Sequence, residues 1–145
     1  MDSFVTKSAA ETTELGRALA SQLKPGDVIA FYGDLGAGKT TMIKGIAAGL
    51  GVVGVVKSPS FVIASEYVGR LPVYHIDLYR LDQNSDFASI GLDAYIEGDG
   101  ACLIEWAERA EKVLPASAIR IRMSVEGAAR RIEISGLRAP LQPVQ

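Results

Sequence analysis

Residues 33–40 match the pattern G-x-x-x-x-G-K-[ST] at every fixed position, and this match limits the possible folds more than any other feature. The pattern is typical of a loop that wraps around nucleotide phosphates, provided that a strand precedes it and a helix follows it. Both flanks satisfy this condition. Residues 28–32 form an unbroken apolar and aromatic run that predicts a short buried strand, and apolar residues recur at helical spacing after the loop. These flanks favour a phosphate-binding loop over an ordinary glycine-rich turn.

Each residue type in this loop has a chemical reason. Gly33, Gly36 and Gly38 can adopt backbone angles closed to other residues, and they carry no side chain that would keep a phosphate away. The backbone N–H groups can therefore curl inward around an anion, with the positive end of the next helix behind them. Lys39 is expected to reach the β- and γ-phosphates, and the Thr40 hydroxyl is the expected magnesium ligand. The sequence predicts a site for a nucleoside triphosphate with Mg²⁺.

The patterns along the rest of the chain alternate as in an α/β domain. A Ser-x-x-Glu capping box predicts a helix from about residue 9. Two strand-like runs separated by a Gly-Arg pair predict a hairpin, which would place antiparallel strands beside a parallel core. We therefore expect a single-domain α/β P-loop NTPase fold with a central mixed sheet flanked by helices. The expected helices cover about residues 9–23, the segment from the loop to residue 50, and residues 108–114; the expected strands cover residues 28–32, 61–68, 72–78, 101–104, 119–125 and 131–135.

Length, charge and cysteine content set further limits. A chain of 145 residues is long enough for one domain, which we place at residues 1–137 with a flexible C-terminal tail at 138–145. A net charge of −2 argues against unaided tight binding to nucleic acid or to an anionic membrane. The single cysteine, Cys102, excludes an intramolecular disulfide, and its apolar neighbours suggest a buried thiol in a reducing compartment. Without a recognisable signal peptide or membrane-spanning run, the chain is expected to be cytoplasmic.

Hydrolysis of a nucleotide also needs a carboxylate that secures magnesium or orients water. Asp77 and Glu105 each close an apolar run, at residues 73–77 and 102–105. Ligands of open α/β sheets bind beyond the carboxyl ends of the strands, so an acid at each tip can face the nucleotide. A solvated residue where a strand leaves the sheet is the plainer alternative for either acid alone, but the pair beside a phosphate-binding loop favours the functional interpretation.

Four motifs in order resemble the TsaE family, formerly called YjeE, which is the ATPase component of bacterial tRNA threonylcarbamoyladenosine synthesis. The motifs are the loop with its following threonine at residues 33–41, Lys-Ser-Pro-Ser-Phe at 57–61, Tyr-His-Ile-Asp-Leu-Tyr-Arg-Leu at 74–81, and Ile-Glu-Trp at 104–106. The resemblance runs from the first helix to about Pro115. Ser60 departs from the threonine common in the second motif, although the hydroxyl is kept.

The resemblance implies slow ATP hydrolysis with Mg²⁺, in a complex with TsaB and TsaD that modifies adenosine in tRNA. In that family TsaD transfers the threonylcarbamoyl group, TsaC supplies the activated intermediate, and ATP hydrolysis resets the TsaB–TsaD complex. The partner proteins would then contact the tRNA, and this chain would act on it only indirectly. By the same resemblance, Thr40 and Glu105 would hold magnesium, Asp77 would be the acid needed for hydrolysis, and Trp106 would lie beside the nucleotide. The phosphate cradle would consist of Gly36, Ala37, Gly38, Lys39, Thr40 and Thr41.

Some residues keep two interpretations. His75 is the only histidine, so a packing role is favoured over a metal site. Trp106 fits a core position or the edge of the site equally well. Arg130 and Arg131 are both candidates to reach the nucleotide, and the pattern does not separate them.

Three other functions use the same loop. A small-molecule or nucleotide kinase needs a lid with arginines, and residues 81–100 contain none. A GTPase switch would carry the guanine-reading [NT]-K-x-D motif, which does not occur in the sequence. A module that binds nucleotide without useful hydrolysis would keep Asp77 and Glu105 for magnesium alone, so the sequence discriminates poorly against it.

Overall fold

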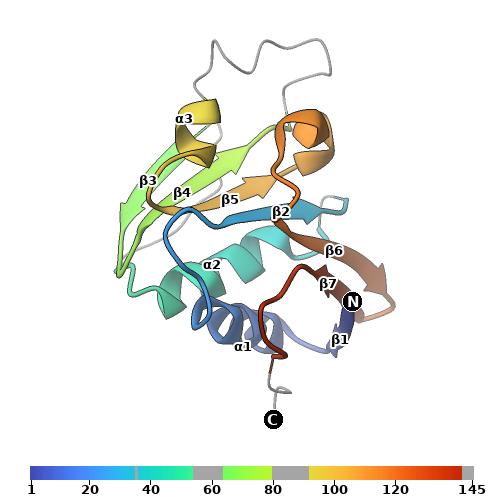
Figure 1. Ribbon diagram of the computed structural model, residues 1–145. Coiled ribbons are helices and arrows are strands. Elements are labelled where there is room, and N and C mark those ends of the chain that lie inside the picture. Colours follow the sequence, from blue (N-terminus) through green and yellow to red (C-terminus); the bar gives the residue numbers. More distant parts are fainter. Residues whose placement is uncertain (35, 54–63, 80–91, 142–145) are drawn as a thin grey trace.

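A seven-stranded mixed sheet with the order β1-β7-β6-β2-β5-β4-β3 forms the centre of the molecule (Figure 1). The computed structural model describes residues 1–34, 36–53, 64–79 and 92–141. The four central strands β6, β2, β5 and β4 run parallel, whereas β1, β7 and β3 are attached in antiparallel pairs. The strands are β1 (Asp2–Thr6), β2 (Val28–Tyr32), β3 (Ala64–Val68), β4 (Pro72–Asp77), β5 (Ala101–Glu105), β6 (Ile119–Glu126) and β7 (Ala129–Ser135).

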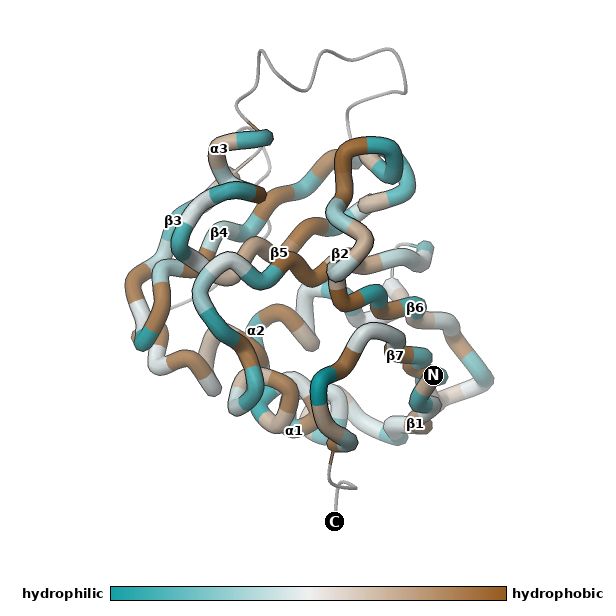
Figure 2. The backbone as a smooth tube through the Cα atoms, viewed as in Figure 1, coloured by the Kyte–Doolittle hydropathy of each residue, from teal (hydrophilic) through white to brown (hydrophobic). Residues whose placement is uncertain are grey.

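Helices cover both faces of this sheet. The helices α1 (Ala9–Ala20) and α2 (Lys39–Gly49) pack on one face, while α3 (Leu92–Ile96) and the 3₁₀ helix η1 (Ala107–Val113) lie on the other (Figure 1). Side chains of the central strands alternate between two apolar clusters, as expected for a sheet buried on both faces. Figure 2 shows the resulting hydrophobic stretches along β2 and β5. Because β4 and β5 alternate in this way, the odd-numbered residues at their ends face α2.

The helices α1 and α2 are in close contact with each other. Ser8 caps α1, since its hydroxyl accepts a hydrogen bond from the Glu11 N–H. The helices cross at Gly45, where a Cβ would lie 2.2 Å from the Thr13 carbonyl oxygen. Only glycine permits this approach, so Gly45 allows the two helices to pack this closely.

The predicted fold class is confirmed, and most predicted elements are present. The strand at residues 28–32 has the predicted bounds, and the hairpin is formed by β3 and β4. Strand β1 was not predicted. Its five residues are too few to show a clear alternating pattern, and its pairing with β7 decides its conformation. The predicted helix at 108–114 is the 3₁₀ helix η1. Cys102 is buried as expected, and burial raises the pKa of its thiol to about 12.

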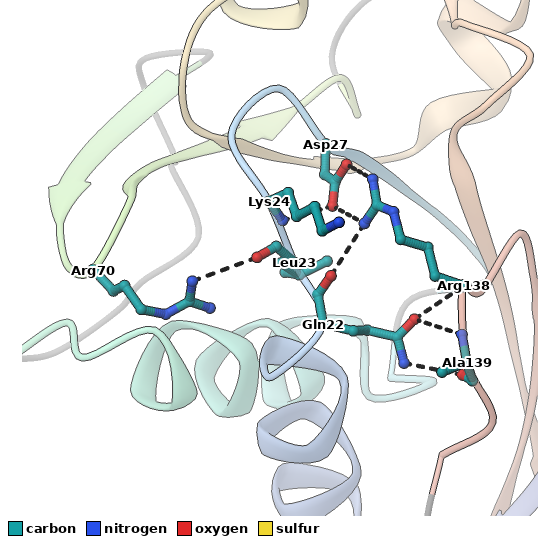
Figure 3. Close-up of polar contacts among 7 residues, drawn as sticks. All are labelled: Gln22, Leu23, Lys24, Asp27, Arg70, Arg138 and Ala139. Atoms are coloured by element: carbon teal, nitrogen blue, oxygen red, sulfur yellow. Dashed lines mark hydrogen bonds and ion pairs between the residues drawn. The ribbon is translucent and has the colours of Figure 1, made fainter.

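The start of the segment expected to be a flexible tail is attached to the domain. The Arg138 guanidinium pairs with Asp27, and its backbone N–H donates to the Gln22 side chain (Figure 3). Leu141 belongs to the larger apolar cluster and exposes only 9% of its surface. Residues 138 and 139 therefore lie against the segment that leads into β2, and Leu141 packs in the core.

Within the described ranges, no helix combines the length and the apolar character needed to cross a membrane.

Candidate nucleotide-binding site

The loop between β2 and α2 has backbone angles that glycine alone tolerates well. Gly33, Gly36 and Gly38 have φ angles of 140°, 82° and 101°. At Gly33 a Cβ would also lie 2.4 Å from the Met123 carbonyl oxygen of β6. The loop therefore passes close to the sheet at its start. At Gly36 a Cβ would meet no atom within 4 Å, so an anion can approach this part of the backbone.

The N-terminus of α2 opens into a cavity of about 250 Å³. Its N-cap residue, Gly38, has no side chain that could cap the first N–H groups of the helix. These N–H groups and the helix dipole favour a bound anion. The cavity is lined by Gly36, Gly38, Lys39, Thr40, Thr41 and Glu105. Ala37 is buried, so it can offer a ligand little beyond its backbone.

Lys39 lies at the base of this cavity with only 4% of its surface exposed. Its ammonium group donates a hydrogen bond to the Gly33 carbonyl and lies 3.9 Å from the centre of the Trp106 ring. Burial lowers the pKa of Lys39, whereas the nearby carboxylates, of which Glu105 contributes most, oppose this shift. The positive charge is therefore buried among acidic groups beside the helix N-terminus, where a phosphate would compete for it.

Thr40 and Glu105 bring two oxygens together at the edge of the cavity. Thr40 Oγ1 donates to Glu105 Oε1 over 3.3 Å. Adjacent ligands of an octahedral Mg²⁺ lie about 2.9 Å apart, because each Mg–O bond is about 2.0–2.1 Å. The two oxygens therefore fit two neighbouring positions around such an ion. Among the described residues no group of three His, Cys, Asp or Glu side chains could hold a metal, so phosphates and water would have to complete the shell.

His75 holds the other oxygen of Glu105. Its Nε2 lies 2.7 Å from Glu105 Oε2, and the imidazole is fully buried. Sequence reasoning assigned His75 a packing role and missed this contact. The sequence did contain a signal for it. His75 lies two residues before Asp77, and residues two apart on a strand share a face, so His75 lies on the same face as the predicted acids Asp77 and Glu105.

Asp77 and Glu105 are direct neighbours across β4 and β5. Both follow the alternation that places their side chains on the face of α2. Burial raises the pKa of Asp77, and the Glu105 charge adds to this effect, while the Tyr79 N–H that donates to its Oδ1 works against it. Asp77 also interacts electrostatically with Lys39. The strand tips thus place the two acids side by side, with Glu105 at the cavity beside the phosphate-binding loop.

A second cavity of about 170 Å³ adjoins the first one. Gly36, Gly38 and Thr41 line both cavities, and Arg130 lines the second. Arg131 instead pairs with Glu126 on the exposed face of β7. The structure therefore separates the two arginines, since only Arg130 faces the cavity beside the loop. The second cavity is lined by Thr6, Ser8, Ala9, Gly36, Gly38, Thr41, Ala128 and Arg130.

Trp106 has a left-handed backbone with φ of 58° and is the one non-glycine residue with positive φ in the described ranges. This conformation strains a bulky residue and persists only where the surroundings fix it. Here the indole lies over the Lys39 ammonium, and the Tyr79 ring packs against it at a centroid distance of 5.0 Å. Of its two interpretations, the structure supports the edge of the site.

Comparison with known proteins identifies the family. The family model for threonylcarbamoyl adenosine biosynthesis protein TsaE matches residues 6–132. The chain belongs to the TsaE family. Its relatives include the tRNA threonylcarbamoyladenosine biosynthesis protein TsaE of Bacillus subtilis, 47% identical over 80% of this chain and 73% of that protein. The TsaE protein of Treponema pallidum is 40% identical over 83% of this chain and 90% of its own.

A solved structure supports the same assignment. The crystal structure of Bacillus subtilis YdiB aligns with a TM-score of 0.81 and 39% sequence identity, covering 94% of this chain and 85% of that one. The resemblance inferred from the four motifs is thus confirmed, and the TsaE family takes part in tRNA threonylcarbamoyladenosine biosynthesis.

Within this TsaE-family chain, the first cavity brings together Glu105 and every predicted cradle residue except Ala37, while Trp106 covers Lys39. Asp77 is not among the residues that line this cavity. Arg130 lies in the adjoining cavity rather than in the first one. The motif at residues 57–61 and the end of the motif at 74–81 lie outside the described residues.

Proposed function

We propose that this chain is a magnesium-dependent ATPase that acts on a TsaB–TsaD complex during threonylcarbamoyl modification of adenosine in tRNA. The observation that carries the proposal is the convergence of Lys39, Thr40 and Glu105 on the cavity at the N-terminus of α2. A helix N-terminus, a buried ammonium and two oxygens at magnesium spacing are the parts that a metal–triphosphate complex needs.

The residues take distinct roles in this proposal. The backbone of residues 36–41 and the Lys39 ammonium bind the β- and γ-phosphates, and Thr40 and Glu105 hold Mg²⁺. The metal would neutralise phosphate charge during hydrolysis. Asp77 lies on the same face and would orient the attacking water. Trp106 covers the Lys39 ammonium and packs against Tyr79, so it would lie beside the bound phosphates.

The adjoining cavity suits the nucleoside end of ATP. It shares Gly36, Gly38 and Thr41 with the phosphate cavity, so one ligand can extend from one cavity into the other. Arg130 offers a planar cation, and Thr6 and Ser8 offer hydroxyl groups, for contact with the base or the ribose.

Action through partner proteins agrees with the charge of the chain. A protein that binds tRNA unaided neutralises phosphates with clustered Lys and Arg, and a net charge of −2 does not favour this. We therefore place tRNA contact on the partners.

The direct test measures ATP hydrolysis by the purified chain alone and with TsaB and TsaD. We expect slow turnover alone and a changed turnover or nucleotide affinity with the pair. A pull-down with ATP, with ADP and without nucleotide should show nucleotide-dependent association. Equal turnover, affinity and association in all conditions would contradict the proposal. Phosphoryl transfer to an added nucleoside or metabolite would instead support the kinase alternative, and displacement of ATP by GTP would support a GTPase.

A further inference from the structure

His75 and Glu105 form a buried contact across two parallel strands. His75 lies opposite Leu103 in the β4–β5 register, so its bond to Glu105 is diagonal and reaches the last residue of β5. The His75 side chain has no exposed surface, and that of Glu105 exposes only 5%. The bond therefore lies beneath the cavity rather than in it, and it is shielded from competing water.

The two oxygens of Glu105 have different partners. Oε2 lies 2.7 Å from His75 Nε2, and Oε1 lies 3.3 Å from Thr40 Oγ1. A carboxylate rotates freely about its last bond unless one oxygen is held. Donation from Nε2–H to Oε2 fixes this rotation and turns Oε1 toward Thr40 and the cavity.

The second nitrogen of the ring suggests that packing alone does not explain this histidine. His75 Nδ1 is buried and has no hydrogen-bond partner within the described part of the chain. Burying a polar atom in this state costs stability, and an aliphatic side chain would avoid the cost. The Nε2 bond to Glu105 is what the imidazole provides and an aliphatic side chain cannot.

We propose that His75 is a positioning residue that orients Glu105 for the magnesium ion of a bound nucleotide. This inference rests on the proposed function, since it requires that Glu105 hold that ion. Partners behind a metal ligand typically change metal affinity or activity by 10- to 100-fold when removed, because they fix the direction of the ligand. His75 itself would touch neither the nucleotide nor the metal.

The matched variants are His75→Gln and His75→Met. Glutamine and methionine are unbranched and similar in length, but only the glutamine amide supplies an N–H donor near the position of Nε2. Calorimetry would measure ATP binding to the parent chain and to each variant in EDTA. A second series would then measure binding at increasing Mg²⁺ concentrations. Thermal unfolding of each variant shows whether the fold is kept.

We expect His75→Met to weaken the apparent Mg²⁺ affinity of the ATP-bound chain by about tenfold or more. ATP binding in EDTA should stay within about twofold of the parent, and His75→Gln should restore most of the Mg²⁺ affinity. In a Glu105→Ala background, His75→Met should cause no further loss. This background separates positioning through Glu105 from a general effect on the fold.

Three results would overturn the inference while leaving the proposed function intact, provided that the parent chain binds Mg²⁺ with ATP. The first is that His75→Met binds Mg²⁺ as tightly as the parent. The second is an equal loss of Mg²⁺ affinity in His75→Met and His75→Gln, and the third is a loss that persists in the Glu105→Ala background. If the parent chain itself binds ATP without any dependence on Mg²⁺, both the inference and the proposed magnesium site are wrong.

Discussion

The ammonium group of Lys39 lies 3.9 Å from the centre of the Trp106 ring, in contact with its π face. Attraction between a cation and an aromatic face stabilises such a pair, the more so where water is excluded. The same ammonium also bonds to the Gly33 carbonyl. Lys39 therefore already has two partners in this structure, and we expect a bound phosphate to replace at least one of these contacts.

Trp106 should report this exchange. It is the only tryptophan in the chain, so intrinsic fluorescence arises from one position beside the cavity. We expect ATP with Mg²⁺ to change its emission in a saturable manner, because Lys39 moves from the ring toward the phosphates. A titration monitored by fluorescence and by calorimetry should give the same affinity. Binding by calorimetry without a change in emission would contradict the predicted exchange.

Lys39→Ala should weaken ATP binding substantially. A hydrogen bond from a charged group contributes about 1.5–3 kcal/mol, which corresponds to roughly 10- to 150-fold in affinity. Lys44→Ala is the matched control, because Lys44 lies on the same helix with its side chain exposed to solvent. Calorimetry should show the loss in the first variant only. Equal affinities in the two variants would exclude Lys39 from the phosphate site.

Asp77→Asn should slow ATP hydrolysis while leaving ATP binding nearly unchanged. The amide keeps the shape of the side chain but cannot accept a proton or align water as a carboxylate does, so we expect a loss of about 10²- to 10⁴-fold in turnover. Asp99→Asn, at an exposed position before β5, is the control. Steady-state hydrolysis and calorimetry separate the two effects. Unchanged turnover would instead support a module that binds nucleotide without useful hydrolysis.

The phosphate-binding loop and the two acids were predictable because local patterns encode them. A glycine-rich loop between a buried strand and a helix has few alternative structures, and the carboxyl ends of parallel strands meet at one edge of the sheet. The proximity of Asp77 and Glu105 could therefore be predicted, although the two residues are far apart in the sequence.

Strand pairing explains what the sequence left open. Arg130 and Arg131 point in opposite directions because adjacent strand residues alternate, and which one faces the cavity depends on the register of β7 with β6 and β1. The bond between His75 and Glu105 likewise depends on the β4–β5 register. Such pairings are long-range, so no local pattern determines them.

The Arg138–Asp27 pair should make stability depend on pH. Burial alone would raise the pKa of Asp27, but the hydrogen bond and charge of Arg138, with help from Lys24, leave the pKa below its ordinary 3.8. A carboxyl with a lowered pKa in the folded state stabilises the fold above the ordinary pKa, and this contribution is lost as pH falls through the folded-state pKa.

Arg138→Met should therefore reduce the free energy of unfolding by about 1 kcal/mol at pH 7. The difference from the parent should shrink as pH falls below about 4, because protonated Asp27 loses its charge in both proteins. Urea unfolding at several pH values measures this. Arg17→Met is the control, since the exposed Arg17–Glu14 pair should contribute less. A difference that does not change between pH 7 and pH 3 would rule out the pair as its source.

The central claim is that one metal–triphosphate complex is enclosed by the loop, Lys39, Thr40 and Glu105. A crystal structure of the chain with Mn²⁺ and a non-hydrolysable ATP analogue tests it most directly, because Mn²⁺ is located by its anomalous scattering. We predict one ion bonded to both Thr40 Oγ1 and a Glu105 carboxylate oxygen, with the γ-phosphate in contact with Lys39 Nζ. An ion bonded to neither residue, or phosphates bound away from the N-terminus of α2, would contradict the account.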